Sequence, residues 1–327
     1  MKDIYDIVRE FGKRRGQQFA LATLVRAQGS SYRRPGARML VCEDGHTVGS
    51  LSGGCLEEEV ALRAHDVLQT GASALMEFDT RRRFGCNGKI EIFVERVSEE
   101  FLHAVGERLA ARENCAVVTV YDEEGCQSGS RVVALETVEG GAPATPQRSR
   151  RSSTLHSMRG AFVQEIHPPL QLLIVGEGPD SAPLRRLADF LGWQAIELMD
   201  TNELMPLDEW SAAIVKTHNY GRDFAALQKL LPLNLRYVGL IGPRKRRDQL
   251  LNELLDVGVA IDAGFFAPAG LDLAAETPEE IAAAVVSEIQ RVFAGGTGAS
   301  LRERKIPIHT AKARPPQASN ECEPLAR

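Results

Sequence analysis

The spacing of apolar positions over the first 136 residues predicts a mixture of strands and helices. Residues 3–15 repeat apolar positions as an amphipathic helix does, and residues 19–29 form the continuous apolar run of a buried strand. Residues 37–54 predict a hairpin that turns at Asp44-Gly45. The other predicted elements are helices over residues 55–71 and 99–112 and strands over residues 74–80, 89–97 and 115–125. We therefore expect an N-terminal domain of mixed α/β type over residues 1–137.

The periodicity disappears between residues 138 and 160, where Gly, Pro, Ser and Arg are frequent. This composition predicts a linker, which we place at residues 138–168. Its Arg-Ser run could contact an anionic partner, but a solvated segment is the favoured interpretation.

Short apolar runs alternate with helical repeats from Pro169 onward. The predicted strands are residues 170–178, 193–200, 212–218 and 236–243, and the predicted helices are residues 182–192, 223–232, 244–258 and 278–293. Strands and helices that alternate at this spacing predict a C-terminal Rossmann-like domain with a parallel sheet, over residues 169–298. The chain is thus of the α/β class, and its polar tail, residues 299–327, is expected to be partly disordered.

Composition excludes several classes of protein. The 327 residues carry a formal net charge of −5, which argues against a general nucleic-acid binder. No apolar run approaches the length of about 18 residues that a membrane span needs, and the N-terminus lacks a signal-peptide core, so we expect a cytoplasmic protein. The six cysteines include no Cys-x-x-Cys pair, which makes a disulfide scaffold or a structural metal site unexpected.

Candidate chemistry in the second domain lies where strands end, because open α/β sheets bind ligands beyond the carboxyl ends of their strands. Gly176 and Gly178 fit the first two positions of a dinucleotide fingerprint, and Asp200 stands near the place of the ribose-binding acid. However, Ser181 occupies the third position, and Glu177 would repel a pyrophosphate. A nicotinamide-nucleotide site and an adapted or vestigial nucleotide pocket both remain open.

Two further strand ends carry residues that suit an anionic ligand. Gly242 permits a close turn, and the following helix begins with Arg244 in a run of four cations that favours a phosphate. The alternative for this run is a solvated basic face. His218 follows an apolar strand and is either a proton carrier or ligand contact, or a hydrogen-bond partner of a neighbouring loop.

The first domain contains three loops with distinctive chemistry. Residues 28–36, which include Arg34, form either an oxyanion-binding loop or a simple tight turn. Ser52-Gly53-Gly54-Cys55 places a thiol at a predicted helix start, where the helix dipole favours a thiolate although three glutamates follow. Cys86 lies in a second Gly-flanked loop next to three arginines. The two cysteines are either buried and inert, or thiolates that hold a soft metal or a sulfur species.

Several of these segments resemble the XdhC/CoxF family. The matching segments are GSSYRRPGARMLV (29–41), VGSLSGGCLEEEV (48–60), FGCNGKIEIFVE (84–95), YVGLIGPRKRRDQLL (237–251) and FFAPAGLDLAAETPEEIAAAVVSEI (265–289). The similarity covers roughly residues 15–97 and 163–293, in the order of the family.

The resemblance implies a molybdenum cofactor chaperone, which matures xanthine dehydrogenase-type hydroxylases without an established turnover of its own. Such a protein protects the cofactor while a cysteine desulfurase sulfurates it, and then inserts it into the molybdenum hydroxylase apoenzyme. The expected cargo is molybdopterin or its cytosine dinucleotide form, and the expected assembly is a homodimer. The competing interpretations are an NAD(P)-dependent oxidoreductase and a protein-binding regulator with a vestigial pocket.

The resemblance also assigns residues. Cys55 matches the cysteine of the family's Ser-Gly-Gly-Cys loop, and Cys86 matches that of a Gly-Cys-Gly-Gly loop, here altered at Asn87. The family's Gly-Ala-Gly-His turn is Gly-Glu-Gly-Pro here, at residues 176–179. The predicted cofactor-binding residues are Cys55, Cys86, Ser52, Gly53, Gly54, Arg34, Gly176, Gly178, Asp200, His218, Gly242 and Arg244, with Cys55 and Cys86 as molybdenum or sulfur contacts.

Overall fold

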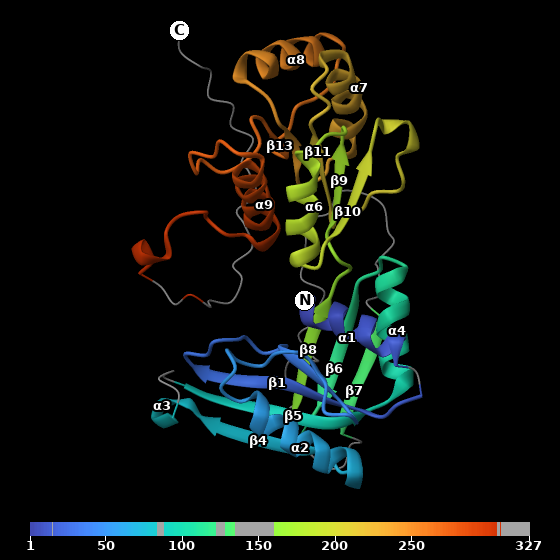
Figure 1. Cartoon of the computed structure of the whole chain (residues 1–327), viewed down its shortest axis with the longest axis vertical. Helices are drawn as coiled ribbons and strands as arrows, with labels where there is room; N and C mark the ends of the chain where they lie inside the picture. Colours follow the sequence, from blue (N-terminus) through green and yellow to red (C-terminus); the bar gives the residue numbers. More distant parts are fainter. Residues whose placement is uncertain (15, 84–87, 122–127, 135–159, 306–307, 309–327) are drawn as a thin grey trace, which may run out of the picture. The chain divides into compact units, whose positions relative to one another are not determined.

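The computed structural model of the chain consists of two compact units, Met1–Pro169 and Leu170–Arg327. It describes all residues except 15, 84–87, 122–127, 135–159, 306–307 and 309–327 (Figure 1). The predicted site residue Cys86 therefore lies outside the described residues, as does most of the predicted tail. The two units are described separately below.

The first unit is built on a five-stranded antiparallel sheet with the strand order β3-β2-β1-β5-β4. Its strands are β1 (Phe19–Gly29), β2 (Arg38–Cys42), β3 (Thr47–Gly49), β4 (Ala74–Asp79) and β5 (Gly88–Val97). A smaller antiparallel sheet has the order β7-β6-β8 and consists of β6 (Cys115–Val120), β7 (Gly129–Ala134) and β8 (Ala161–Ile166). The helices are α1 (Lys2–Lys13), α2 (Glu57–Thr70), α3 (Thr80–Arg83) and α4 (Glu99–Ala110).

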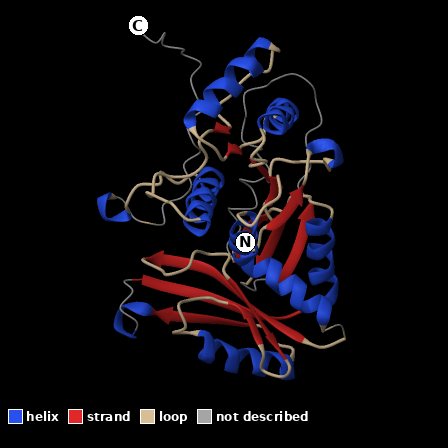
Figure 2. Ribbon diagram, turned by 45° about the horizontal axis from the view of Figure 1, so that its top comes forward, coloured by secondary structure: helices blue, strands red, loops and turns tan. Residues whose placement is uncertain are grey.

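The long apolar run of β1 is explained by burial on both faces. Ala20, Ala22 and Leu24 pack into a core under α2, whereas Phe19 and Leu21 pack into a second core with α1, α4 and the smaller sheet. Figure 2 shows α2 against one face of the five-stranded sheet.

Strand β8 corrects the predicted linker. Residues 161–166 fall inside the range 138–168, but they pair with β6 along its whole length. The sequence signal was weak because β8 lies at the edge of its sheet and most of its residues are only partly buried. Its pairing completes the hydrogen bonding of β6, whose residues are all buried.

The second unit is a doubly wound parallel sheet, which confirms the predicted fold class. The strand order is β10-β9-β11-β12-β13, with β9 (Gln171–Val175), β10 (Gln194–Leu198), β11 (Ser211–Val215), β12 (Val238–Leu240) and β13 (Phe265–Phe266). The α-helices are α6 (Ser181–Phe190), α7 (Tyr220–Leu230), α8 (Arg244–Asp256) and α9 (Pro278–Ala294), and the short 3-10 helices are η1 (Thr201–Glu203), η2 (Leu231–Leu233) and η3 (Leu301–Glu303). One face of the sheet is covered by α6 and α9 and the other by α7 and α8.

Local signals set the helix ends of both units. Gly71 ends α2 with φ +73°, and Thr277 and Glu280 form a reciprocal capping box at the start of α9, with Pro278 as the first helical residue. None of the described helices is both long and apolar enough to cross a membrane.

Candidate functional site

The structure brings loops of the first unit together at the end of β1. Gly29, the last residue of β1, pairs with Gly88, the first residue of β5, and a Cβ built on Gly88 would lie 2.5 Å from the carbonyl oxygen of Gln28. The hydroxyl of Thr80 donates a hydrogen bond of 2.7 Å to the carbonyl of Gly88. Thr80 and Gly88, which stand on either side of residues 84–87 in the sequence, are therefore joined to each other, and Gly88 lies beside the end of β1.

The Ser52–Cys55 loop lies near the end of β1, where Gly53 approaches Tyr32. This side chain is 66% exposed, and its ring lies 3.6 Å from a Cβ built on Gly53. A methyl group at Gly53 would therefore be in ordinary van der Waals contact with the ring. Residues 30–32 thus connect the Ser52–Cys55 loop with Gly88.

The Ser52–Cys55 loop satisfies its own polar groups. The hydroxyl oxygen of Ser52 accepts hydrogen bonds from the backbone N–H groups of Gly54, Cys55 and Leu56 at 3.1–3.3 Å. The carboxylate of Glu57 accepts from the N–H groups of Leu51, Ser52 and Leu56 and from the Ser52 hydroxyl. Burial raises the pKa of Glu57, but these hydrogen bonds outweigh it and hold the pKa below 4.5.

The position of Cys55 differs from the expected helix start. Helix α2 begins at Glu57 with Leu56 as its N-cap residue, so Cys55 precedes the helix by two positions. Its thiol is exposed, whereas those of Cys42 and Cys115 are buried. Since Ser52 and Glu57 already accept from the N–H groups of residues 51, 52 and 54–56, the loop offers a ligand the Cys55 side chain rather than an anion cradle.

Arg33 and Arg34, which are neighbours in the 28–36 loop, differ in burial: Arg33 is partly buried and Arg34 is exposed. Arg33, which lies in the predicted 28–36 loop but was not among the predicted site residues, forms an ion pair with Asp3 and donates a hydrogen bond of 2.8 Å to the Ser50 hydroxyl. It ties the loop to α1. The predicted Arg34 has an exposed side chain on the same loop.

In the second unit, the predicted Gly176 and Gly178 form the turn after β9. They have φ values of +114° and +145°, a region that favours glycine. A Cβ on Gly176 would lie 2.7 Å from the carbonyl oxygen of Lys216, so the turn is tightly packed against the end of β11. The structure thus requires glycine at both positions for reasons of backbone conformation and space.

Three charged or polar side chains meet at this turn, and the sequence identified only one of them. The Lys216 ammonium is fully buried and donates to Asp180 Oδ1 at 2.9 Å. The other oxygen of Asp180 lies 3.2 Å from His218 Nε2. His218 itself has φ +55°. The signals that could have identified the pair are a lysine directly after the apolar run of β11 and an aspartate just before α6.

The cations at the start of α8, where the sequence predicts phosphate binding, differ in burial. Arg246 is largely buried, whereas Arg244 is exposed. Asp223 is fully buried and accepts from the Thr217 N–H at 3.1 Å, from the Thr217 hydroxyl at 2.6 Å and from Arg246. The Arg246 guanidinium passes 3.4 Å from a Cβ built on Gly242. Arg246 therefore serves the packing of the fold.

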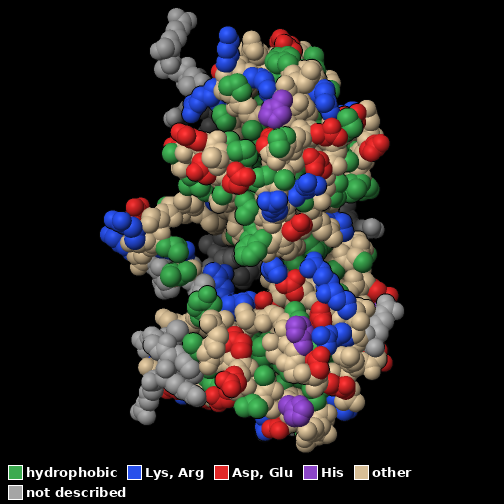
Figure 3. Space-filling model, in the orientation of Figure 1, with side chains coloured by type: hydrophobic (Ala, Val, Ile, Leu, Met, Phe, Trp, Pro, Cys, Tyr) green, Lys and Arg blue, Asp and Glu red, His purple; other side chains and the backbone are tan. Residues whose placement is uncertain are grey.

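Arg244 remains on the surface. Its side chain is exposed, and it forms no ion pair with any residue that the structure describes. Figure 3 shows Lys and Arg side chains on the part of the second unit that carries α8. Asp200, in contrast, uses Oδ1 to accept from the Asn202 N–H at 2.7 Å and caps η1.

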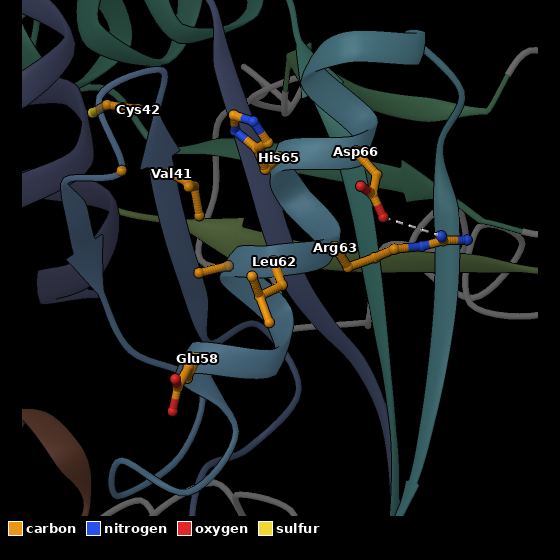
Figure 4. Close-up of a pocket in the computed structure, with 9 residues that line it drawn as sticks. Val41, Cys42, Glu58, Leu62, Arg63, His65 and Asp66 are labelled. Carbon is orange, nitrogen blue, oxygen red and sulfur yellow. Dashed lines mark ion pairs between the residues drawn. The ribbon is translucent and has the colours of Figure 1, made fainter.

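A hollow on the surface of the first unit lies away from these residues. It has a volume of about 490 Å³ and is lined by α2 and by the β2–β3 hairpin, with Val41, Leu62 and His65 among its residues (Figure 4). It contains none of the predicted site residues. Among the described residues, no cluster of three or more His, Cys, Asp or Glu side chains could hold a metal ion.

Comparison with known proteins matches both units to one family. The model of the XdhC and CoxI family matches residues 13–79, and that of the XdhC Rossmann domain matches residues 172–289. A probable xanthine dehydrogenase subunit of Bacillus subtilis (strain 168) is 33% identical over 313 residues, which cover 84% of this chain and 92% of that protein. The chain belongs to the XdhC and CoxI family. The resemblance that the sequence motifs indicated is thereby confirmed.

Two other proteins extend the XdhC comparison. The molybdenum cofactor insertion chaperone PaoD of Escherichia coli (strain K12) is 25% identical over 293 residues, or 85% of this chain and 84% of that protein. A crystal structure described as a xanthine dehydrogenase from Bacillus halodurans has a TM-score of 0.75 at 24% identity and covers 91% of this chain and 98% of that chain. It shows that the fold is shared. The family match over residues 13–79 includes the Arg34 and Cys55 loops and ends before Cys86.

Proposed function

We propose that this protein binds the molybdenum cofactor and serves the maturation of a molybdenum hydroxylase of the xanthine dehydrogenase type. The names of the relatives from B. subtilis and E. coli support this role. The observation that carries the proposal is the exposed Cys55 thiol in a hydrogen-bonded loop, in which Gly53 lies against the Tyr32 ring.

The chemistry of this region suits the cargo. A thiolate is a soft ligand that can contact molybdenum or its sulfur ligands, and an exposed tyrosine ring offers a flat face to a pterin. Because the loop N–H groups are occupied by Ser52 and Glu57, we assign binding to Cys55, Tyr32 and, outside the described residues, Cys86. Arg34 supplies a cation on the adjoining loop.

The finer steps belong to the same proposal. We expect the protein to shield the cofactor while a cysteine desulfurase adds the terminal sulfur, and then to pass it to the apoenzyme in the cytoplasm. We further expect the protein to be a homodimer and its cargo to include the cytosine dinucleotide form of the cofactor. No catalytic residue is assigned.

A cofactor-retention experiment tests the proposal. Purified protein is incubated with released molybdenum cofactor, and bound pterin and molybdenum are measured after gel filtration. Cys55→Ala is expected to lower both at least several-fold while circular dichroism stays unchanged, and Cys86→Ala is expected to cause a smaller loss. Cys322→Ala, in the polar tail outside the described residues, is the control. Full retention by folded Cys55→Ala would contradict the assignment.

The parallel sheet and its glycine turn favour one alternative, an NAD(P)-dependent oxidoreductase. Calorimetry with NAD and NADH, together with a dye-linked hydride-transfer assay, separates the two functions. We expect nicotinamide nucleotides to bind no tighter than the millimolar range, about −4 kcal/mol, because carboxylates line the turn. Micromolar NADH binding would favour the oxidoreductase.

A further inference from the structure

The strand order of the parallel sheet reverses between β9 and β11. Doubly wound sheets bind ligands at this point, with a phosphate beside the glycine turn. In this chain the place is taken by a side chain of the protein itself. A Cβ built on Gly178 would lie 2.6 Å from Asp180 Oδ1 and 3.6 Å from the Lys216 nitrogen, so carboxylate and ammonium lie directly beside the turn.

Lys216 is the unusual member of this group. Its side chain has no solvent exposure, whereas that of Asp180 is 25% exposed and that of His218 is 59% exposed. A buried ammonium requires a negative partner, and it can donate three hydrogen bonds. Among the described residues it has a single acceptor, Asp180. The Lys216 ammonium is thus a buried cation with two further N–H donors for an anion. Solvent reaches this group from the side of Asp180 and His218.

The backbone at His218 supports the same view. Its φ of +55° lies in the left-handed region, which costs a non-glycine residue about 1 kcal/mol or more. This conformation brings the imidazole to the second oxygen of Asp180. Two nitrogen groups therefore converge on one carboxylate, as they would on a bound phosphate.

We propose that Lys216, His218 and the Gly176–Gly178 turn form a subsite for a phosphate group, which Asp180 closes with its own carboxylate. A phosphate-bearing ligand then binds only in exchange for Asp180. With Asp180 in place the Lys216–Asp180 pair is neutral, and the exposed Glu177 adds further repulsion, so the native subsite admits phosphate weakly. This inference goes beyond the proposed function and does not depend on molybdenum cofactor binding.

The test compares two aspartates at neighbouring strand ends. Calorimetry measures pyrophosphate binding at constant ionic strength to the wild type, Asp180→Asn and Asp200→Asn. Both substitutions remove one negative charge, but only Asp180 contacts Lys216. We expect Asp180→Asn to bind pyrophosphate at least about tenfold tighter, or roughly 1.4 kcal/mol, and Asp200→Asn to match the wild type. Equal affinities of the two variants would overturn the proposal.

Asp180→Asn also leaves a buried ammonium without its counter-ion, so its folding requires a separate measurement. If this variant is unstable, pyrophosphate should raise its melting temperature or restore its folding, and sodium chloride of equal ionic strength should not. The double variant Asp180→Asn/Lys216→Met should lose the response to pyrophosphate. Absence of rescue, or rescue that persists without Lys216, would overturn the subsite.

Discussion

Each unit has a glycine-rich turn, but the two turns lie beside different side chains. One exposes a thiol, and the other lies against a buried ion pair. In the first unit, the Ser52–Cys55 loop is capped by residues within a few positions in sequence and exposes a thiol. In the second, the Gly176–Gly178 turn lies against Lys216, whose partner Asp180 is 36 residues away. The glycines determine where a ligand can approach the backbone, and the neighbouring charged side chains determine whether a ligand can bind there.

The difference extends to how each loop is held. Around Cys55 the hydrogen bonds are local and partly exposed, whereas the turns at the ends of β9 and β11 depend on buried ionic groups. Breaking a buried ion pair costs more than removing a local cap. Substitutions in the second unit should therefore act mainly on stability, and substitutions in the first mainly on the exposed chemistry.

The largest expected effect is that of Asp223→Ala. This change leaves Arg246 and the Thr217 N–H without their acceptor in a fully buried place, which should lower the free energy of unfolding by about 3–5 kcal/mol. Denaturant titration followed by circular dichroism measures it. Asp248→Ala, which removes an exposed ion pair on α8, is the control and should stay within about 0.5 kcal/mol of the wild type. Similar losses for both variants would contradict the buried role of Asp223.

The next effect concerns thiol accessibility in the first unit. Cys55 is exposed, whereas Cys42 and Cys115 are at most 1% exposed and can react only after local unfolding. With a maleimide reagent and peptide mass spectrometry, we expect Cys55 to be labelled at least about 100-fold faster than the other two. The rates should converge in denaturant. Comparable native rates for Cys42 and Cys55 would show that the loop does not present its thiol as described.

A smaller effect is expected from Glu57→Gln. The carboxylate accepts four hydrogen bonds in the Cys55 loop, so its loss should cost about 1–2 kcal/mol. Because the folded-state pKa of Glu57 lies below 4.5, this stability is present above pH 4.5 and is lost as the pH falls through the folded pKa. Thermal unfolding between pH 3 and pH 8 tests both points. The exposed neighbour Glu58→Gln should show neither effect.

The sequence predicted most elements because their signals are local. The run of β1, the Gly71 stop and the Thr277–Glu280 cap involve residues close together in the chain. Strand β13 was missed because two residues carry no periodicity.

The glycine turn after β9 was predictable from the sequence, whereas the charged side chains around it were not. Gly176 and Gly178 were identified from their spacing, but the pairing of Asp180 with Lys216 arises because β9 and β11 are adjacent in the sheet. The pairing of Asp223 with Arg246 likewise joins residues 23 positions apart. Such contacts follow from strand order, which no local pattern encodes.

The smallest expected effect concerns a buried charge of the first unit, that of Glu95 in β5. Glu95 is 6% exposed, and no direct ion pair joins it to the buried Arg38 among the described residues; it accepts from the Ser130 N–H at 2.8 Å and the Ser130 hydroxyl at 2.5 Å. Burial raises the pKa of Glu95 above 4.5 and lowers that of Arg38 to about 10.

Since the folded-state pKa of Glu95 is raised, the folded state loses stability as the pH rises from 4.5 through that pKa. Glu95→Gln keeps a donor and an acceptor for Ser130 and removes the charge. It should therefore be more stable than the wild type by about 1 kcal/mol at neutral pH, and the advantage should vanish below pH 4.5. Unfolding curves at several pH values measure this, with Glu77→Gln on the exposed side of β4 as control. A difference that does not vary with pH would mean that the charge of Glu95, like that of Asp180 beside Lys216, is already compensated.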